Sequence, residues 1–295
     1  MATLYTQADA NIRRTWFLIT GFLVLIIALG WLFSYLFDNY AILIFAVIFS
    51  VIQAFISYWY SDKIVLALSG AQPIEKSDNP ELYRIVENIC ITAGLPVPKI
   101  YILPEAQPNV FATGRDKDHA VVAVTAGILQ KLEKSELEGV IAHELSHIGN
   151  RDMFLATVIV VLVGVISLLS NFFLRMGRFS GRRRDRDSGG GILLIFGLLG
   201  AILAPLVATL IQLAISRKRE FLADADGALL TRYPEGLARA LEKISRDAVP
   251  LGSANPSTSH LYIVNPFKEE SWLTNLFSTH PPIEERIKIL REMEV

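Results

Sequence analysis

The chain has a single cysteine, Cys90, among its 295 residues. One cysteine cannot form an intramolecular disulfide, and it cannot build a zinc site from cysteine pairs. A metal site in this chain would therefore use histidine and carboxylate ligands. Charged residues are also scarce, at 19%, and the net charge is −1. A nucleic-acid-binding protein needs a clear basic surplus, so the composition argues against a nucleic-acid partner.

Hydrophobic residues make up 52% of the chain, which is more than an ordinary soluble enzyme contains. Four stretches without Lys, Arg, Asp or Glu are long enough to cross a bilayer as helices, which takes about 20 residues. They are residues 15–37, 41–60, 154–174 and 192–215. The first is longer than the apolar core of a signal peptide, so we expect a retained anchor. Because only three residues separate the first two, they predict a tight helical hairpin; buried core helices are the less favoured alternative.

Two polar segments, residues 61–153 and 216–295, remain. Asn79 and Pro80 are typical of a helix start, and Gly94 is typical of the end of that helix. Three runs with strand composition follow: Lys99–Leu103, 110–113 and 120–124. Residues 114–118 between the last two runs predict a hairpin turn. The two polar segments therefore predict a small α+β domain that the third and fourth apolar stretches divide in sequence.

The segment His143-Glu144-Leu145-Ser146-His147 places two histidines four residues apart. On a helix they share one face, so both imidazoles can reach one metal ion, and zinc suits such a pair. Glu144 can reach a water beside the metal, which predicts a general base for hydrolysis. Ser135 and Glu138 have the spacing of a capping box and predict the start of this helix. The alternative is an exposed helix face whose histidines bind no metal.

A hydrolytic zinc site usually has three protein ligands and one position for water. Three other histidines are present: His119, His260 and His280. None follows the motif closely, so the third ligand must come from elsewhere. Glu220 and Asp224 are again four residues apart, directly after the fourth apolar stretch. Glu220 is the strongest candidate ligand, Asp224 could orient a ligand histidine, and Asp226 is a weaker competitor.

These motifs resemble those of the HtpX-type membrane zinc metalloproteases, which are gluzincins related to the CAAX prenyl protease and to mitochondrial stress proteases. The resemblance covers nearly the whole chain, because its segments follow the order of that family. Besides the histidine motif and the pair Glu220 and Asp224, they are the two N-terminal apolar runs, residues 108–114, residues 149–152, and residues 279–282 with Arg286.

The resemblance implies that His143, His147 and Glu220 bind a single Zn²⁺ ion, that Glu144 is the catalytic base, and that Asp224 supports a ligand. It also implies a strand that holds extended substrate by main-chain pairing. The residues of this strand are Asn109, Val110, Phe111 and Ala112. An ordinary strand and turn is the equal alternative for this segment.

His280 resembles a histidine of the same family that could stabilise the oxyanion of the reaction. Its alternative role is to cap a local turn before Pro281 and Pro282.

We expect a mainly α-helical integral membrane protein with about four apolar helices and a small α+β zincin catalytic domain split in sequence. Residues 1–60 would form an N-terminal transmembrane hairpin, and residues 61–153 would form the first part of the catalytic domain. Residues 154–215 would form a second pair of apolar helices with an arginine-rich loop at 175–191. Residues 216–295 would complete the catalytic domain with the third zinc ligand.

The expected function is that of a zinc endopeptidase that cleaves membrane or misfolded polypeptides beside the lipid bilayer, and the resemblance suggests a role in membrane-protein quality control. The main alternative is a membrane scaffold or chaperone in which the zinc is only a structural brace. A CAAX-type prenyl-peptide protease would need a larger chamber inside the membrane. Basic residues are nearly balanced between the two sides, so they do not orient the chain. The resemblance favours the cell (plasma or inner) membrane and a cytoplasmic active site.

Overall fold

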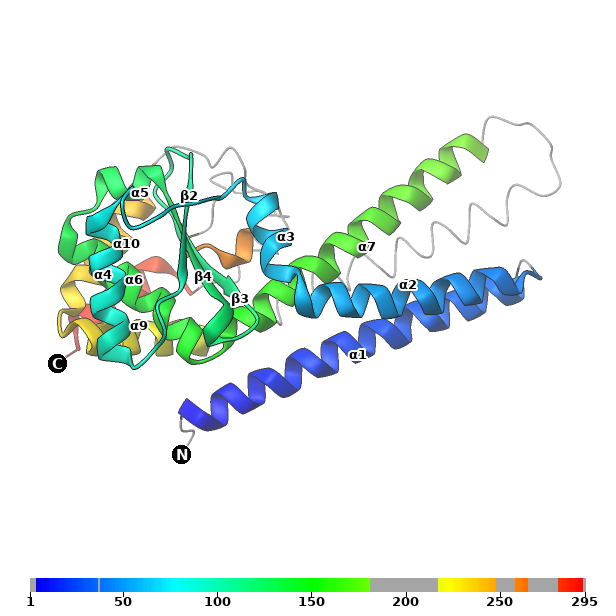
Figure 1. Cartoon of the computed structure of the whole chain (residues 1–295), viewed down its shortest axis with the longest axis horizontal. Helices are drawn as coiled ribbons and strands as arrows, with labels where there is room; N and C mark the ends of the chain where they lie inside the picture. The colour runs from blue at the N-terminus through cyan, green and yellow to red at the C-terminus, as the bar shows by residue number, and fades with distance from the viewer. Residues whose placement is uncertain (1–3, 37, 181–216, 248–257, 265–280, 294–295) are drawn as a thin grey trace.

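The computed structural model describes residues 4–36, 38–180, 217–247, 258–264 and 281–293. Within them the molecule has two regions (Figure 1). Long apolar helices project to one side, and a mixed layer of helices and strands forms the other end. The expected class, an α-helical membrane protein with a small α+β unit, is confirmed.

The N-terminal hairpin consists of α1 (Leu4–Leu36) and α2 (Tyr40–Trp59). Asn39 caps α2 by accepting a hydrogen bond from the Ala41 backbone N–H. A Cβ on Gly30 would lie 2.2 Å from the Cβ of Ala46, so the small residues let the two helices approach closely. Both helices are long and apolar enough to cross a membrane, which confirms the predicted pair.

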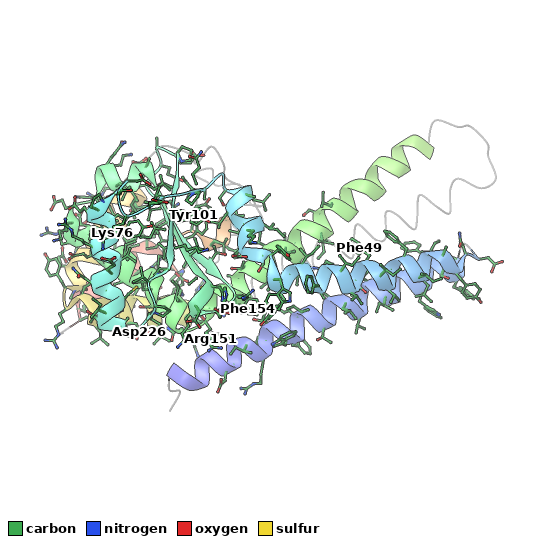
Figure 2. All side chains as sticks on the ribbon, viewed as in Figure 1. Phe49, Lys76, Tyr101, Arg151, Phe154 and Asp226 are labelled. Carbon is green, nitrogen blue, oxygen red and sulfur yellow. The ribbon has the colours of Figure 1, made fainter. Side chains whose placement is uncertain are left out.

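The third apolar stretch lies in α7 (Asp152–Ser180), which packs against the hairpin. Phe154 lies where α7 meets the hairpin (Figure 2), and its ring makes an edge-to-face contact with Tyr58. Arg151, with φ of 56°, joins α7 to the preceding helix α6 (Lys134–Gly149) at an 82° bend. Among the described residues two helices qualify as spans, or three if this bent pair is one. The predicted stretch 192–215 lies outside the described residues.

A four-stranded sheet forms the centre of the other region. Its strands are β1 (Gln72–Pro73), β2 (Lys99–Leu103), β3 (Val110–Gly114) and β4 (Ala120–Thr125). Their order is β1-β2-β4-β3, with β2 and β4 parallel and the other pairs antiparallel. The three predicted strands and the hairpin turn are confirmed, while β1 was not predicted. Strand β3 lies at the edge of the sheet.

Helices surround this sheet. Besides α6 they are α3 (Ser61–Leu68), α4 (Pro80–Ala93), α5 (Ala126–Lys131), α9 (Arg217–Thr231), α10 (Pro234–Arg246) and α12 (Ile283–Arg291), with short 3₁₀ turns η1 (Lys117–His119) and η2 (Ser259–Leu261). The predicted ends of α4 are confirmed, since Asn79 caps its start and Gly94 ends it with φ of 65°. Helix α6 packs against α4, α9 and α10, so it is the core helix of this region.

The start of α6 differs from the prediction. The capping box uses Glu133 and Glu136, not Ser135 and Glu138. The Glu133 backbone N–H donates to the Glu136 carboxylate at 2.8 Å, and Lys243 pairs with the same carboxylate at 2.8 Å. The extended residue is Glu133, with ψ of 163°, so the helix has already begun when the chain reaches Ser135. The prediction was wrong because glutamate is not among the residues that usually begin a helix, so Glu133 was not considered as the cap.

Candidate metal centre

Three potential metal ligands converge between helices α6 and α9. His143 and His147 lie on one face of α6, and their Nε2 atoms are 3.2 Å apart. Glu220 on α9 reaches them, with Oε1 3.6 Å from His147 Nε2 and Oε2 3.9 Å from His143 Nε2. Ligands about 2.0–2.1 Å from a tetrahedral zinc ion lie roughly 3.3 Å apart, so the spacing and the donor set fit zinc.

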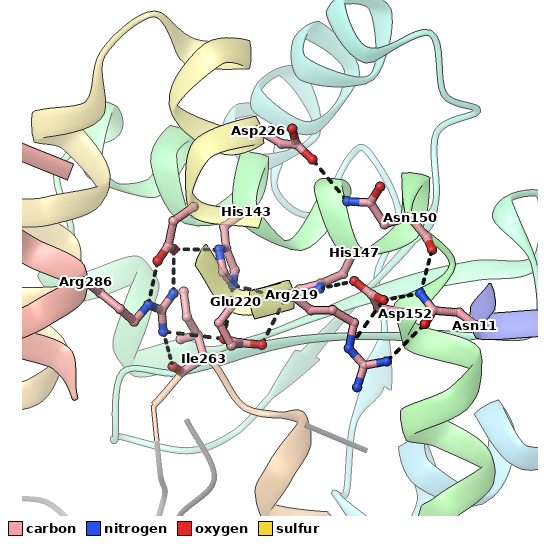
Figure 3. Close-up of polar contacts among 11 residues, drawn as sticks. Asn11, His143, His147, Asn150, Asp152, Arg219, Glu220, Asp226, Ile263 and Arg286 are labelled. Carbon is pink, nitrogen blue, oxygen red and sulfur yellow. Dashed lines mark hydrogen bonds and ion pairs between the residues drawn. The ribbon is translucent and has the colours of Figure 1, made fainter. Parts of the chain in front are cut away.

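Helix α9 reaches the histidines because it packs very closely on α6. Gly227 is the contact point: a Cβ there would lie 3.0 Å from the His143 backbone nitrogen and 3.2 Å from its Cα. With hydrogen in place of Cβ, the two helices approach until Glu220 and Asp224 face the histidine pair (Figure 3). This glycine was not singled out in the sequence, because by itself it is only a weak helix former.

Asp224 supports the first histidine and is in turn held by an arginine. Its Oδ1 lies 3.0 Å from His143 Nδ1, on the ring side opposite the metal position. Arg286 donates two hydrogen bonds to Asp224, at 2.8 and 2.7 Å, and lies 3.6 Å from a Glu220 oxygen. Burial disfavours the Asp224 carboxylate, but Arg286 outweighs it and lowers the pKa of Asp224 to about 2. Asp224 is therefore ionised and can accept the proton of His143 Nδ1.

The second histidine has a different support. His147 Nδ1 lies 3.2 Å from Asp152 Oδ2, at the start of α7. Burial disfavours the imidazolium, yet the Asp152 hydrogen bond and the Glu220 charge prevail and raise the pKa of His147 to about 9. Without a metal, the two carboxylates thus favour the protonated ring. A bound cation must displace that proton, since metal ligation needs the neutral ring.

Glu144 is the titratable group beside this cluster. Its side chain is buried, and burial raises its pKa to about 7, while the His147 charge and the Ala112 backbone N–H act in the opposite direction. A carboxylate with a pKa near neutrality suits proton transfer in both directions. The side chain faces the same cavity as the histidines.

This cavity has a volume of about 40 Å³, enough for an ion and water but not for a peptide. One wall is formed by β3 and another by residues 260–263, which lie along the outer edge of β3. The Ile263 backbone N–H donates to the Val110 carbonyl at 3.1 Å, and the Tyr262 ring packs edge-on against Phe111. Asn109 donates to the Val264 carbonyl at 3.0 Å. The edge of the predicted substrate strand is thus partly covered by the chain itself.

The structure brings together five of the predicted site residues: His143, Glu144, His147, Glu220 and Asp224. Asp226, the weaker competitor, instead accepts a hydrogen bond from Asn150 at 3.1 Å, away from the histidines (Figure 3). His280 lies outside the described residues. His119 pairs with Asp116 on the surface, whereas His260 lines the cavity.

Sequence reasoning assigned no role to several polar residues at this centre. Asp152, Arg219, His260 and Arg286 all contribute to it, as does Asn11 from the first apolar helix. Asp152 and Arg286 were noted only as parts of matching segments. A charged residue directly before an apolar span, as Asp152 is, was the one available signal.

Comparison with known proteins decides the family. The sequence pattern described as Peptidase family M48 matches residues 76–294. The chain belongs to peptidase family M48. It is 46% identical over 299 residues to a Protease HtpX homolog of Caldanaerobacter subterraneus subsp. tengcongensis, with 99% of each chain covered. It is 52% identical over 241 residues to one of Syntrophobacter fumaroxidans, covering 80% of this chain and 84% of that protein.

The M48 assignment agrees with the fold. The crystal structure of Ste24p from S. mikatae aligns with a TM-score of 0.51 at 20% identity, covering 97% of this chain and 66% of that one. The chain is therefore a membrane-associated M48 metalloprotease that acts on polypeptides. Membership implies a bound metal, typically zinc, and the three converging side chains are the group of described residues suited to hold it.

Proposed function

We propose that the protein is a zinc-dependent endopeptidase that cleaves membrane-associated or misfolded polypeptides at the membrane surface. The observation that carries this proposal is the convergence of His143, His147 and Glu220 on one cavity that the buried side chain of Glu144 also lines. Two imidazoles and one carboxylate would hold the ion and leave a position for water, as hydrolytic zinc sites do.

The bound ion would lower the pKa of a water and polarise the scissile carbonyl. Glu144 takes the proton of the attacking water and returns it to the departing amine. Asp224 and Asp152 hold the two ligand imidazoles through their Nδ1 atoms, which keeps each Nε2 directed at the ion. His280 would supply an oxyanion donor from outside the described residues.

Substrate would bind in an extended conformation along β3, with Asn109, Val110, Phe111 and Ala112 providing main-chain contacts. The edge position of β3 and the cavity wall formed by Ala112 support this role. A peptide that pairs with β3 at Val110 would have to displace the segment of residues 260–263, because the Ile263 N–H already occupies the Val110 carbonyl.

The proposed location is the plasma or inner membrane with the metal centre on the cytoplasmic side, and the proposed role is membrane-protein quality control. His147 is separated by only a short turn from α7, which continues as an apolar helix. The site therefore lies beside the bilayer, where membrane-associated chains are the accessible substrates. The four-part division of the chain stays a prediction.

The decisive test is Glu144→Gln in the full-length protein. We expect this variant to keep one equivalent of zinc and to lose about 10²–10⁴-fold in casein hydrolysis, because the amide cannot transfer protons. Glu138→Gln on the same helix is the matched control, since Glu138 is partly exposed and pairs only weakly with Lys134 at 3.9 Å. It should keep full activity. Equal activity in both variants would contradict the mechanism.

The same experiment separates the enzyme from a zinc-braced scaffold or chaperone. In a scaffold the ion would have four protein ligands, and neither variant would change a measurable hydrolysis rate. The buried carboxylate of Glu144 argues against that alternative, because a purely structural ion needs no ionisable group beside its ligands.

A further inference from the structure

The first membrane helix contributes a side chain to the support of the metal centre. Asn11 lies near the start of α1 and is only 2% exposed. Its Nδ2 donates to Asp152 Oδ1 at 2.5 Å and to the Asn150 carbonyl at 3.2 Å. Its Oδ1 accepts a hydrogen bond from Arg219 at 3.2 Å. The side chain is thereby joined to both ends of the α6–α7 turn and to α9 (Figure 3).

The orientation of this amide follows from its partners. A carboxylate and a carbonyl only accept hydrogen bonds, whereas a guanidinium only donates them. The amide nitrogen must therefore face Asp152 and Asn150, and the amide oxygen must face Arg219. Both hydrogens of the amide nitrogen are used in this arrangement, so the amide has one stable position.

Asp152 transmits this position to the ion's ligand. One carboxylate oxygen accepts from Asn11, and the other lies 3.2 Å from His147 Nδ1. Arg219 contacts the first oxygen as well, at 3.7 Å, and precedes the ligand Glu220 in sequence. Asn11 and Arg219 together therefore hold the carboxylate that fixes the ring plane of His147.

Apolar contacts also attach α1 to the rest of the molecule. Ile19, Phe22 and Ile26 of α1 pack in one cluster with Phe154 and Ile159 of α7. Burying an asparagine side chain costs free energy of desolvation unless its amide is fully hydrogen-bonded. Asn11 directs its polar groups at Asp152, Asn150 and Arg219 beside the metal centre, which indicates a role in holding the Asp152 carboxylate.

We propose that Asn11 is a positioning residue of the metal centre: through Asp152 it sets the orientation of His147, so that α1 is part of the enzyme's active-site support and not only its anchor. This inference rests on the proposed zinc binding by His143, His147 and Glu220. Loss of a hydrogen bond made directly to a metal ligand typically weakens metal affinity by about 10–100-fold. Asn11 is one hydrogen bond farther from the ion, so we expect an effect near the lower end of this range.

The test uses full-length protein in detergent micelles. Zinc dissociation constants are measured by competition with a chromophoric chelator, and the visible spectrum of the cobalt-substituted protein reports ligand geometry. Asn11→Ala removes every contact of the side chain, whereas Asn11→Leu removes the polar contacts, keeps a similar volume without adding a charge, and serves if the alanine variant does not fold. We expect the zinc dissociation constant to rise about tenfold or more in both, with an altered cobalt spectrum.

The matched control is Ser34→Ala, which removes a buried polar group from the same helix roughly 35 Å away along its axis. It should bind zinc within about twofold of the wild type. Wild-type affinity and spectrum in both Asn11 variants would overturn the inference. If the wild-type protein itself binds no zinc, the proposed function fails together with this inference.

A double-mutant cycle tests whether Asn11 acts through Asp152. In an Asp152→Ala background, Asn11→Ala should change the zinc dissociation constant less than about threefold, because the carboxylate that it positions is gone. If the two losses multiply, Asn11 acts independently of Asp152, and the inference is wrong. A general loss of folding would instead weaken zinc binding equally in either background.

Discussion

Arg286 is the side chain that joins the two carboxylates of α9. It has no exposed surface, donates two hydrogen bonds to Asp224, and lies 3.6 Å from Glu220. The positive charge of Arg286 compensates the buried negative charges of Asp224 and Glu220. Removing it would leave a buried charge unpaired, which is very costly. The guanidinium therefore holds both the third ligand and the partner of the first ligand from the C-terminal helix α12.

Replacing Arg286 with methionine should reduce the free energy of unfolding by about 3–5 kcal/mol, because Asp224 would remain buried without a compensating charge. Thermal or denaturant unfolding in detergent would measure the change. Arg291→Met is the control on the same helix: Arg291 is 44% exposed and pairs with Glu235 at 3.1 Å and Glu242 at 3.0 Å in contact with solvent, so a much smaller loss is expected. Equal losses in the two variants would show that Arg286 has no special role.

Among single residues, the sequence predicted those site residues that are paired within one helical turn. The pairs His143–His147 and Glu220–Asp224 are each one helical turn apart, so their shared faces follow from helical periodicity alone. Asn11 and Arg286 could not be inferred in this way, because they reach the centre from the first and last described helices. Their roles depend on tertiary packing, which a single sequence does not encode locally.

Among the strands, β3 is the outermost of the sheet, and its free edge is partly covered by residues 260–263 of the same chain. The predicted strand is correct to within one residue, but the pairing of the Ile263 N–H with the Val110 carbonyl was not foreseen. Residues 261–264 form a short apolar run that is compatible with an extended segment, but a run of this kind does not indicate which strand it will lie against. The same contact that completes the wall of the cavity also occupies part of the predicted substrate strand.

We expect bound substrate to displace this segment. In the Glu144→Gln variant, an excess of an unstructured casein fragment should speed amide hydrogen exchange in residues 259–264, because Ile263 loses its acceptor when a peptide pairs with β3. Exchange in α4 should stay unchanged, since this helix packs against α6, away from the edge of β3 (Figure 1). Slower exchange of residues 259–264 would show instead that substrate binds over the closed segment.

For the molecule as a whole, hydropathy predicted the two helices of the hairpin, which are both long and apolar enough to cross a membrane, and a helix over residues 154–174, which lie in α7. The sequence also placed the histidine motif a few residues before an apolar stretch, beside the membrane, but it did not predict the angle between the two helices. The 82° bend at Arg151 connects the metal-binding helix directly to α7. A positive φ at a non-glycine residue carries a conformational cost. Here the two residues on either side of Arg151, Asn150 and Asp152, are held by Asn11 of α1, which is far away in sequence.

This connection gives a prediction for the topology. Helix α7 has 29 residues and is thus about 43 Å long, which exceeds the hydrocarbon thickness of about 30 Å. If it crosses completely, residue Gly190 lies on the side opposite the metal centre. A reporter that is active only in the cytoplasm should then give no signal when fused at Gly190 and a strong signal when fused after Val295. A strong signal at both positions would mean that residues 154–215 do not cross the bilayer twice, and the arginine-rich loop would then lie on the cytoplasmic side as the positive-inside rule favours.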